Sequence, residues 1–288
     1  MGNRRHAPLA PVVLDQVFMP KIESSLFDLS YFDTLSGLDT PIHRLDPRVK
    51  VVTTMLFIVA VMSFDKYETS GLVPFVLYPV ALLAVGNLPL GYLLSKVLLA
   101  APFVFFVGIF NPFFDRAILV HLGPVGISGG WISFASILIR FILTVSAALL
   151  LVASTGIHGV CQALDKLGFP RSFTVQLLFL YRYLFVLVDE ASRMTRARAL
   201  RSFGTRGTGL QVVGHMIGQL LLRTLDRAQR IHAAMLCRGF DGEIRQFRPL
   251  KIRTGDILFA VGWPAAFLFM RIYDVPQWLG KLATGLVP

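Results

Sequence analysis

The chain has 288 residues, of which 55% are hydrophobic and only 16% are charged, whereas a soluble globular domain carries about 25% charged residues. This composition excludes an ordinary soluble domain and indicates an integral membrane protein. Residues 154–253 hold 16 Lys and Arg against 6 Asp and Glu, which is +10 of the total charge of +11. Positive segments stay on the cytoplasmic side of a membrane, and contact with anionic headgroups explains this charge better than nucleic acid does.

Residues 1–48 are predicted to form an N-terminal segment at the membrane interface. The stretch 18–38 mixes apolar residues with aspartates and serines, so it is too polar to span. Nothing before residue 20 resembles a cleavable signal. Asp46 is the expected N-cap of a helix whose first turn contains Pro47. The N-terminus is predicted to be cytoplasmic because basic residues precede the first apolar run, namely Arg44, Arg48 and Lys50.

Residues 49–153 are predicted to contain four transmembrane helices, at 51–64, about 71–86, 97–110 and 132–153. The first run is short: 14 residues cover ~21 Å of a hydrocarbon core that is ~30 Å thick. Its charged flanks must therefore reach the interfaces. Arg140 lies inside the fourth run, where a charge is costly. A place near the outer end of the helix is favoured over a role in transport.

Residues 154–253 are predicted to form cytoplasmic coupling helices, and residues 254–288 a final transmembrane helix and tail. The run 173–188 is apolar enough to span, but a helix along the inner membrane face is favoured because arginine and acidic residues flank or interrupt it. A second long helix is expected over 210–238, with an apolar face and arginines elsewhere. The predicted fold is an all-α integral membrane protein with about five transmembrane helices and two long coupling helices.

Both long helices are expected to end in the pattern Ala-x-x-x-Arg, followed by Ser or Gly and then Phe. The two segments start at Ala197 and Ala234, 37 residues apart. In a helix, residues i and i+4 share one face. The small alanine lets another backbone approach, and the arginine can reach a carboxylate with two hydrogen bonds. Gly239 fits a helix C-cap. Ordinary helix ends also carry Arg and Gly, so either segment alone would not indicate a docking role. The repetition of the pattern is what favours one.

No catalytic, cofactor or metal site is predicted. Cys161 and Cys237 form no CxxC pair, and no His, Cys and carboxylate cluster has the spacing of metal ligands. The sequence contains no GxSxG, HExxH or GxxxxGK[ST] motif. Without a phosphate-binding loop, this chain is not expected to hydrolyse ATP. If it is part of a pump, another chain must be the motor.

The paired segments resemble the two Ala-Arg-Gly signatures of the transmembrane T component of energy-coupling factor (ECF) transporters. The sequence from His43 to Lys50, His-Arg-Leu-Asp-Pro-Arg-Val-Lys, is similar to the sequence before the first span of that family. The resemblance covers nearly the whole chain. It implies a non-catalytic, multi-pass scaffold in the cytoplasmic (inner) membrane, without a cofactor. Its coupling helices would dock on two ABC-type ATPase subunits, while a separate membrane subunit binds the substrate.

Carried over by position, the residues implied to couple to the ATPases are Ala197, Arg201, Ser202, Ala234, Arg238 and Gly239. Ser202 departs from the glycine that is usual in the family. The long N-terminal segment and the Arg-Ser-Phe sequence look most like the cobalt/nickel (CbiQ) branch. That branch implies cobalt or nickel as substrate, a metal-binding membrane partner and a link to cobalamin biosynthesis.

Three alternatives remain at this point. The chain could be the T component of a vitamin-importing ECF transporter. It could be a membrane-bound enzyme that holds a phosphate-bearing substrate on its basic region, although no convincing general base is present. It could be a standalone secondary transporter, which would need polar residues within its spans. Apart from Arg140, such residues are nearly absent.

Overall fold

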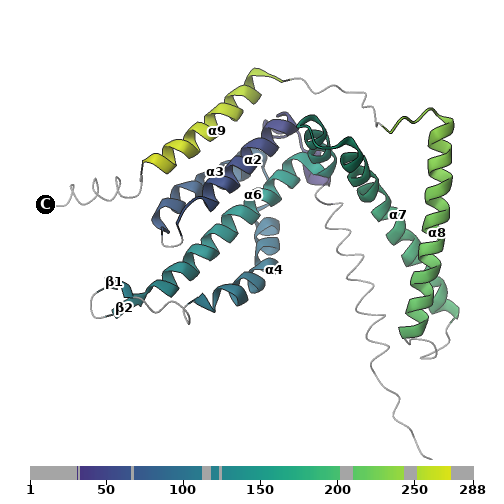
Figure 1. The fold of residues 1–288 in the computed structure, drawn as a ribbon, viewed down its shortest axis with the longest axis horizontal. Helices are drawn as coiled ribbons and strands as arrows, with labels where there is room; N and C mark the ends of the chain where they lie inside the picture. Colours follow the sequence, from purple (N-terminus) through teal and green to yellow (C-terminus); the bar gives the residue numbers. More distant parts are fainter. Residues whose placement is uncertain are drawn as a thin grey trace, which may run out of the picture. The chain divides into compact units, whose positions relative to one another are not determined.

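The computed structural model describes residues 31, 33–65, 68–111, 118–122, 125–201, 210–242 and 252–273. Its elements are shown in Figure 1 and are α2 (Pro47–Met62), η1 (Ser70–Val76), α3 (Leu77–Gly86), α4 (Leu90–Gly108), β1 (Ile118–Leu122), β2 (Val125–Ser128), α6 (Gly129–Lys166), α7 (Arg171–Arg201), α8 (Leu210–Cys237) and α9 (Thr254–Ile272). The helical fold that the sequence predicts is confirmed. A two-stranded antiparallel hairpin, β1–β2, interrupts the helices.

Some predicted features lie outside the described residues. They are the interfacial stretch before Tyr31 and the C-terminal tail.

The chain divides into two compact units. Unit 1 comprises Met1–Tyr31 and Gly168–Phe247, and therefore contains α7 and α8. Unit 2 comprises Phe32–Leu167 and Arg248–Pro288, and contains the other elements. The chain passes from unit 2 into unit 1 after α6 and returns before α9.

Four helices in the described part of the chain are long and apolar enough to cross a membrane: α4, α6, α7 and α9. The stretch Ser70–Gly86 is a shorter apolar helix, and α2 has 16 residues. The protein is therefore embedded in a membrane. The run at 173–188 lies within α7, whose length and composition would permit a crossing.

Two predicted helix boundaries differ from the structure. The third span was expected to start at residue 97, but α4 begins at Leu90. The turn before it is shorter than expected because Asn87 ends α3 in the left-handed conformation, with φ of 49°, and Pro89 is the N-cap of α4. The fourth span was expected to stop at Ala153, but α6 continues to Lys166 across a non-helical Gly156.

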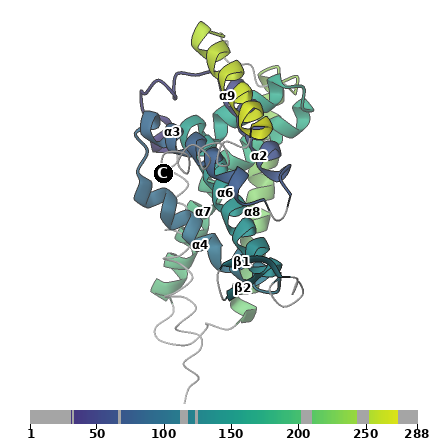
Figure 2. The same cartoon turned by 90° about the vertical axis from the view of Figure 1, so that its left-hand side faces the viewer.

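The core of unit 2 is a cluster of aromatic rings. It joins α2, η1, α3 and α9 through Phe57, Phe75, Tyr78, Trp263 and Phe267. Ring centroids lie 4.6 Å apart for Phe57 and Tyr78, 5.0 Å for Tyr78 and Trp263, and 5.4 Å for Phe57 and Phe267. These spacings are typical of attractive aromatic pairs. The long helix α6 packs against α2, α3 and α4, with α2 beside it (Figure 2).

Two arginines bind backbone carbonyls where α2 ends. Arg140 of α6 donates a hydrogen bond to the carbonyl of Asp65. Arg271 of α9 donates to the carbonyl of Ser63 at 3.1 Å and lies 4.2 Å from the ring centroid of Phe64. Cationic side chains are stabilised near the C-terminus of a helix. Arg140 therefore stabilises the C-terminal end of the neighbouring helix α2, which is a structural role.

The other end of α2 contains a buried polar cluster, here called the α2–α9 clasp, formed by Asp46, Lys50, Ser154, Arg253 and Asp256. Asp256 is 1% exposed. Its carboxylate accepts the amide of Asp46 at 2.8 Å and the amide of Arg253 at 2.6 Å. The ammonium of Lys50 donates to the carbonyl of Ser154 at 2.9 Å. The clasp thus ties the first turns of α2 and α9 to α6.

The turn before α2 makes stability depend on pH. Burial lowers the pKa of His43 below its usual value of 6.5, and the positive charge of Lys50 lowers it further. The unfolded chain therefore binds a proton more readily, so stability is lost as pH falls below about 6.5. We expect the melting temperature of the wild type in detergent to drop between pH 7 and pH 5 more than that of His43→Gln. Parallel pH profiles for the two proteins would contradict this expectation.

Candidate coupling surface

Helices α7 and α8 form an antiparallel pair within unit 1 (Figure 1). Near the end of α7, Arg198 contacts the sulfur of Met216, close to the start of α8, at 3.8 Å. In the middle, Glu190 of α7 accepts a hydrogen bond from Arg223 of α8 at 2.6 Å and lies 3.8 Å from Arg227. One carboxylate thus holds two arginines of the neighbouring helix.

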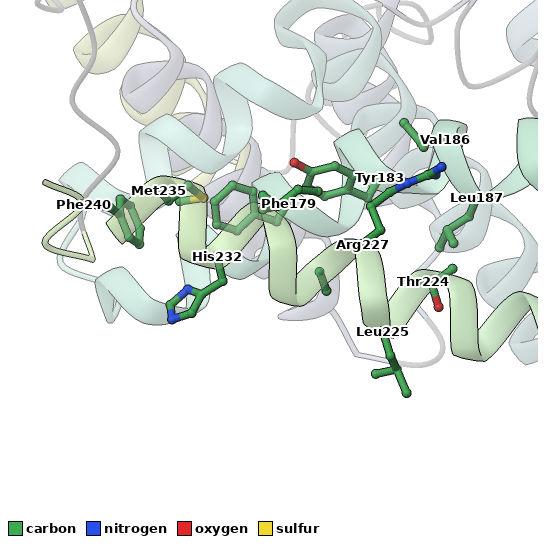
Figure 3. A pocket seen from close by; sticks show the side chains of 12 residues that line it. Phe179, Tyr183, Val186, Leu187, Thr224, Leu225, Arg227, His232, Met235 and Phe240 are labelled. Carbon is green, nitrogen blue, oxygen red and sulfur yellow. The ribbon is translucent and has the colours of Figure 1, made fainter. Parts of the chain in front are cut away.

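An apolar groove lies between the start of α7 and the end of α8. Its volume is ≈ 400 Å³. Figure 3 shows the rings of Phe179 and Tyr183 beside α8, with Met235 next to Phe179, whereas His232 projects away from them. The groove is lined by Phe179, Tyr183, Val186, Leu187, Thr224, Leu225, Arg227, Ala228, Ile231, His232, Met235 and Phe240.

The antiparallel arrangement places the two Ala-x-x-x-Arg segments at opposite ends of the pair. Arg201 is the last residue of α7. Phe240, just beyond Arg238, lines the groove together with Phe179 near the start of α7. Arg201 lies 22 positions after Phe179 on α7, which corresponds to ~33 Å at 1.5 Å per residue. The repeat is visible in the sequence, but the distance in space between the two segments is visible only in the structure.

The second segment ends α8 in a Schellman motif. The amide of Phe240 donates to the carbonyl of Met235 at 3.0 Å, and the amide of Gly239 donates to the carbonyl of Leu236 at 3.0 Å. Gly239 is left-handed, with φ of 78°, as this motif requires. Gly239 is therefore the helix C-cap that its sequence position indicates. The side chains of Met235 and Phe240 both line the groove, and these are the two positions that often form an apolar contact in such caps.

Both arginines are exposed and available. Ala197, Arg201, Ala234, Arg238 and Gly239 are all exposed. Within the described residues, the side chains of Arg201 and Arg238 have no hydrogen bond or ion pair to the protein. Ser202 lies outside the described residues, so its place in the first segment remains a prediction. Each described arginine therefore extends from a helix end, next to a small exposed alanine one turn earlier.

Replacing Gly239 by alanine should loosen this helix end. A Cβ at this position would meet nothing within 4 Å, so the cost comes from the left-handed backbone alone, about 1–2 kcal/mol. We expect the amides of Gly239 and Phe240 to exchange hydrogen at least roughly fivefold faster, from the lower end of that range. Gly168→Ala is the matched control, since Gly168 has φ of 95° and an equally open surrounding. Unchanged exchange in Gly239→Ala would contradict the role of the cap.

Sequence reasoning missed Glu190 and the groove. In the sequence, Asp189 and Glu190 appear only as charges that flank an apolar run. Glu190 lies 33 positions from Arg223, and no local spacing rule predicts such a pair. The apolar residues of the groove are spread over both helices in the same way. An excess of arginines on one face of α8 was the only available signal.

Comparison with known proteins identifies the family. A family model described as "Cobalt transport protein" (CbiQ) matches residues 39–248, which is most of the chain. The chain belongs to the CbiQ family. It is a T component of the ECF transporter class.

Several curated relatives match between 56% and 80% of this chain. The energy-coupling factor transporter transmembrane protein EcfT of Streptococcus thermophilus is 26% identical over 223 residues, covering 71% of this chain and 82% of that protein. The cobalt transport protein CbiQ of Rhodobacter capsulatus is 29% identical over 166 residues, covering 56% and 61%. An uncharacterized protein of Methanocaldococcus jannaschii is 26% identical over 241 residues, covering 80% and 81%.

The CbiQ-family match extends over both units. It begins within the turn before α2 and ends after α8, so it includes the α7–α8 pair and both arginine segments. The relatives are named as transmembrane components of transporters. The chain is accordingly a membrane-embedded component of an ECF transporter.

Proposed function

We propose that this CbiQ-family chain is the scaffold that couples two ABC-type ATPases to a separate substrate-binding membrane subunit. The observation that carries the proposal is the placement of Arg201 and Arg238. They extend from opposite ends of one antiparallel helix pair, and both are exposed and bind no partner among the described residues. Two equivalent docking ends about 33 Å apart suit two copies of an ATPase, one at each end.

The local chemistry of each end supports the same proposal. The small side chains of Ala197 and Ala234 leave room for another backbone beside the helix. A guanidinium binds a carboxylate through two parallel hydrogen bonds, and Arg238 lies where the helix carbonyls end. The proposed coupling set is Ala197, Arg201, Ser202, Ala234, Arg238 and Gly239.

We propose an orientation in the inner membrane with the α7–α8 pair and the N-terminus on the cytoplasmic side. The support is the charge of +10 over residues 154–253 and the positive-inside rule. ATPase partners require this orientation, because ATP is on that side.

The proposed substrate is the cobalt ion, or nickel, bound by the separate membrane subunit. The support is the description of the matched family as a cobalt transport protein and the name of the Rhodobacter capsulatus relative. Other relatives are named only as energy-coupling factor components. A vitamin-importing transporter is therefore the second candidate.

Affinity purification from the native membrane tests the assignment. We expect the chain to bring down ATPase subunits and a small membrane protein, and uptake by the reconstituted complex to require ATP. A metal-binding membrane partner would support cobalt or nickel as the substrate. A vitamin-binding partner would show that the substrate is a vitamin instead. Recovery of the chain without ATPases, together with turnover or transport by the chain alone, would refute the coupling role.

A further inference from the structure

The long helix α6 is broken near the start of its last third. Gly156 has φ of 68° and ψ of 156°, a conformation essentially restricted to glycine. A Cβ at this position would lie 2.9 Å from the hydroxyl oxygen of Ser36. The break divides α6 into a long arm, 129–155, and a short arm, 157–166. Contacts with other parts of the protein must therefore fix the angle between the two arms.

The break leaves the last carbonyls of the long arm without the amides that would follow in a continuous helix. Lys50 of α2 supplies a donor: its ammonium binds the carbonyl of Ser154 at 2.9 Å. A cation at this position also stabilises the negative end of the long arm. The side chain of Lys50 therefore caps the end of the long arm, although Lys50 and Ser154 are 104 positions apart in the sequence.

Lys50 is itself held in place. It is 4% exposed, and the carboxylates of Asp46 and Asp256 are close enough to stabilise its charge. Those carboxylates are fixed by the amides of the α2 and α9 first turns, as described for the clasp. One lysine thus connects the break in α6 to two other helices.

The clasp borders a polar cavity with a volume of ≈ 350 Å³, lined in part by Ser36, Lys50, Ser154, Thr155 and Arg253. Asp46 also lines this cavity, and its buried oxygen Oδ2 has no hydrogen-bond partner in the part of the chain that the structure describes. The break is therefore not packed in apolar side chains. Its geometry depends on a few polar contacts, and Lys50 makes the contact that reaches the break itself.

The clasp is also close in sequence to both connections between the units. The short arm leads from the break to Leu167, and unit 1 begins at Gly168. Arg253 follows shortly after the chain returns to unit 2 at Arg248. We propose that Lys50 is a positioning residue, which holds the α6 break in one geometry and so sets the direction of the arm that leads into the coupling helices. This inference rests on the proposed coupling function.

Spin labels on the two arms test the positioning role in the full chain without partners. We would place them at Ile142, which is 49% exposed, and at Lys166, whose side chain is 55% exposed, after replacing Cys161 and Cys237. In Lys50→Gln we expect the distance distribution to broaden about twofold, because the arms are then free to move. Lys50→Arg and the control Lys96→Gln should keep the wild-type width. An unchanged width in Lys50→Gln would overturn the proposal.

A second variant covers the case in which Lys50→Gln does not fold. Lys50→Met with Asp256→Asn removes both charges together, so it leaves no new unpaired charge at Asp256, while Ser154 still lacks its donor. The same broadening is expected. In the reconstituted importer, either variant should keep its ATPases but lose about tenfold in uptake per ATP hydrolysed. Normal uptake per ATP would overturn the link to coupling. A failure of ATPases to bind the wild-type chain would refute the proposed function, but would not alter the label distances.

Discussion

With Arg201 and Arg238 both replaced by glutamate, the chain should insert and purify normally but lose its ATPase subunits. Both side chains are exposed and bind nothing within the described residues, so their reversal leaves the fold intact. Disrupting one partner of a close charge pair at an interface costs about 2–5 kcal/mol. Each end should therefore lose at least roughly 30-fold in affinity. The measurement is the amount of ATPase recovered with the tagged chain, followed by ATP-dependent uptake.

Arg230→Glu is the matched control. Arg230 is exposed on α8, two turns before Arg238, and the same charge change there should leave ATPase recovery unchanged. The single variants separate the two ends: each should weaken ATPase docking at its own end only. If the double variant retains both ATPases and normal uptake, the arginines are ordinary solvated helix ends and the coupling surface lies elsewhere.

Asp256→Ala should destabilise unit 2 more than other single changes in the clasp. The carboxylate is 1% exposed, and two backbone amides and the charge of Lys50 depend on it. Removing one member of a buried charged group typically costs about 3–5 kcal/mol. For a chain of this size that corresponds to a fall of roughly 10 °C in melting temperature. Thermal unfolding in detergent, followed by helical circular dichroism, measures it.

Two variants bracket this prediction. Asp256→Asn keeps an oxygen that can accept the amide of Asp46, so its melting temperature should lie between those of the wild type and Asp256→Ala. Asp39→Ala removes a carboxylate whose ion pair with Arg44 is largely exposed, and exposed pairs contribute little. It should melt as the wild type does. Identical melting of Asp256→Ala and the wild type would show that the clasp does not stabilise the fold.

Much of the fold could be predicted because its signals are local. Asp46 accepts the amide of Arg48 at 2.9 Å and is the N-cap of α2, with Pro47 in the first turn, as the sequence indicates. The apolar runs correspond to helices, and Gly239 ends α8 as its position suggests. These features depend on residues within four or five positions of each other, so periodicity and capping rules can identify them.

The remainder depends on contacts between distant residues. The amide of Asp46 binds Asp256, 210 positions away, and no spacing rule connects them. Gly156 lies just beyond the predicted end of the fourth span, and its break within one long helix becomes understandable only beside Lys50 and Ser36. The candidate site shows the same limit. Repetition identified the two arginine segments, but only the pairing of α7 with α8 places them at opposite ends.

The apolar groove between α7 and α8 has a consequence for the cell. None of the α8 residues whose exposure is described is buried, and Leu225, which lines the groove, is 50% exposed. When an apolar partner binds such a groove, the folded protein is stabilised by mass action. The gain is about 2.7 kcal/mol when the concentration of the partner is 100 times its Kd. A copy synthesised in excess of its membrane partners lacks that gain. We therefore expect unassembled copies to be the first that proteases remove, so that the supply of partners sets the abundance of this subunit.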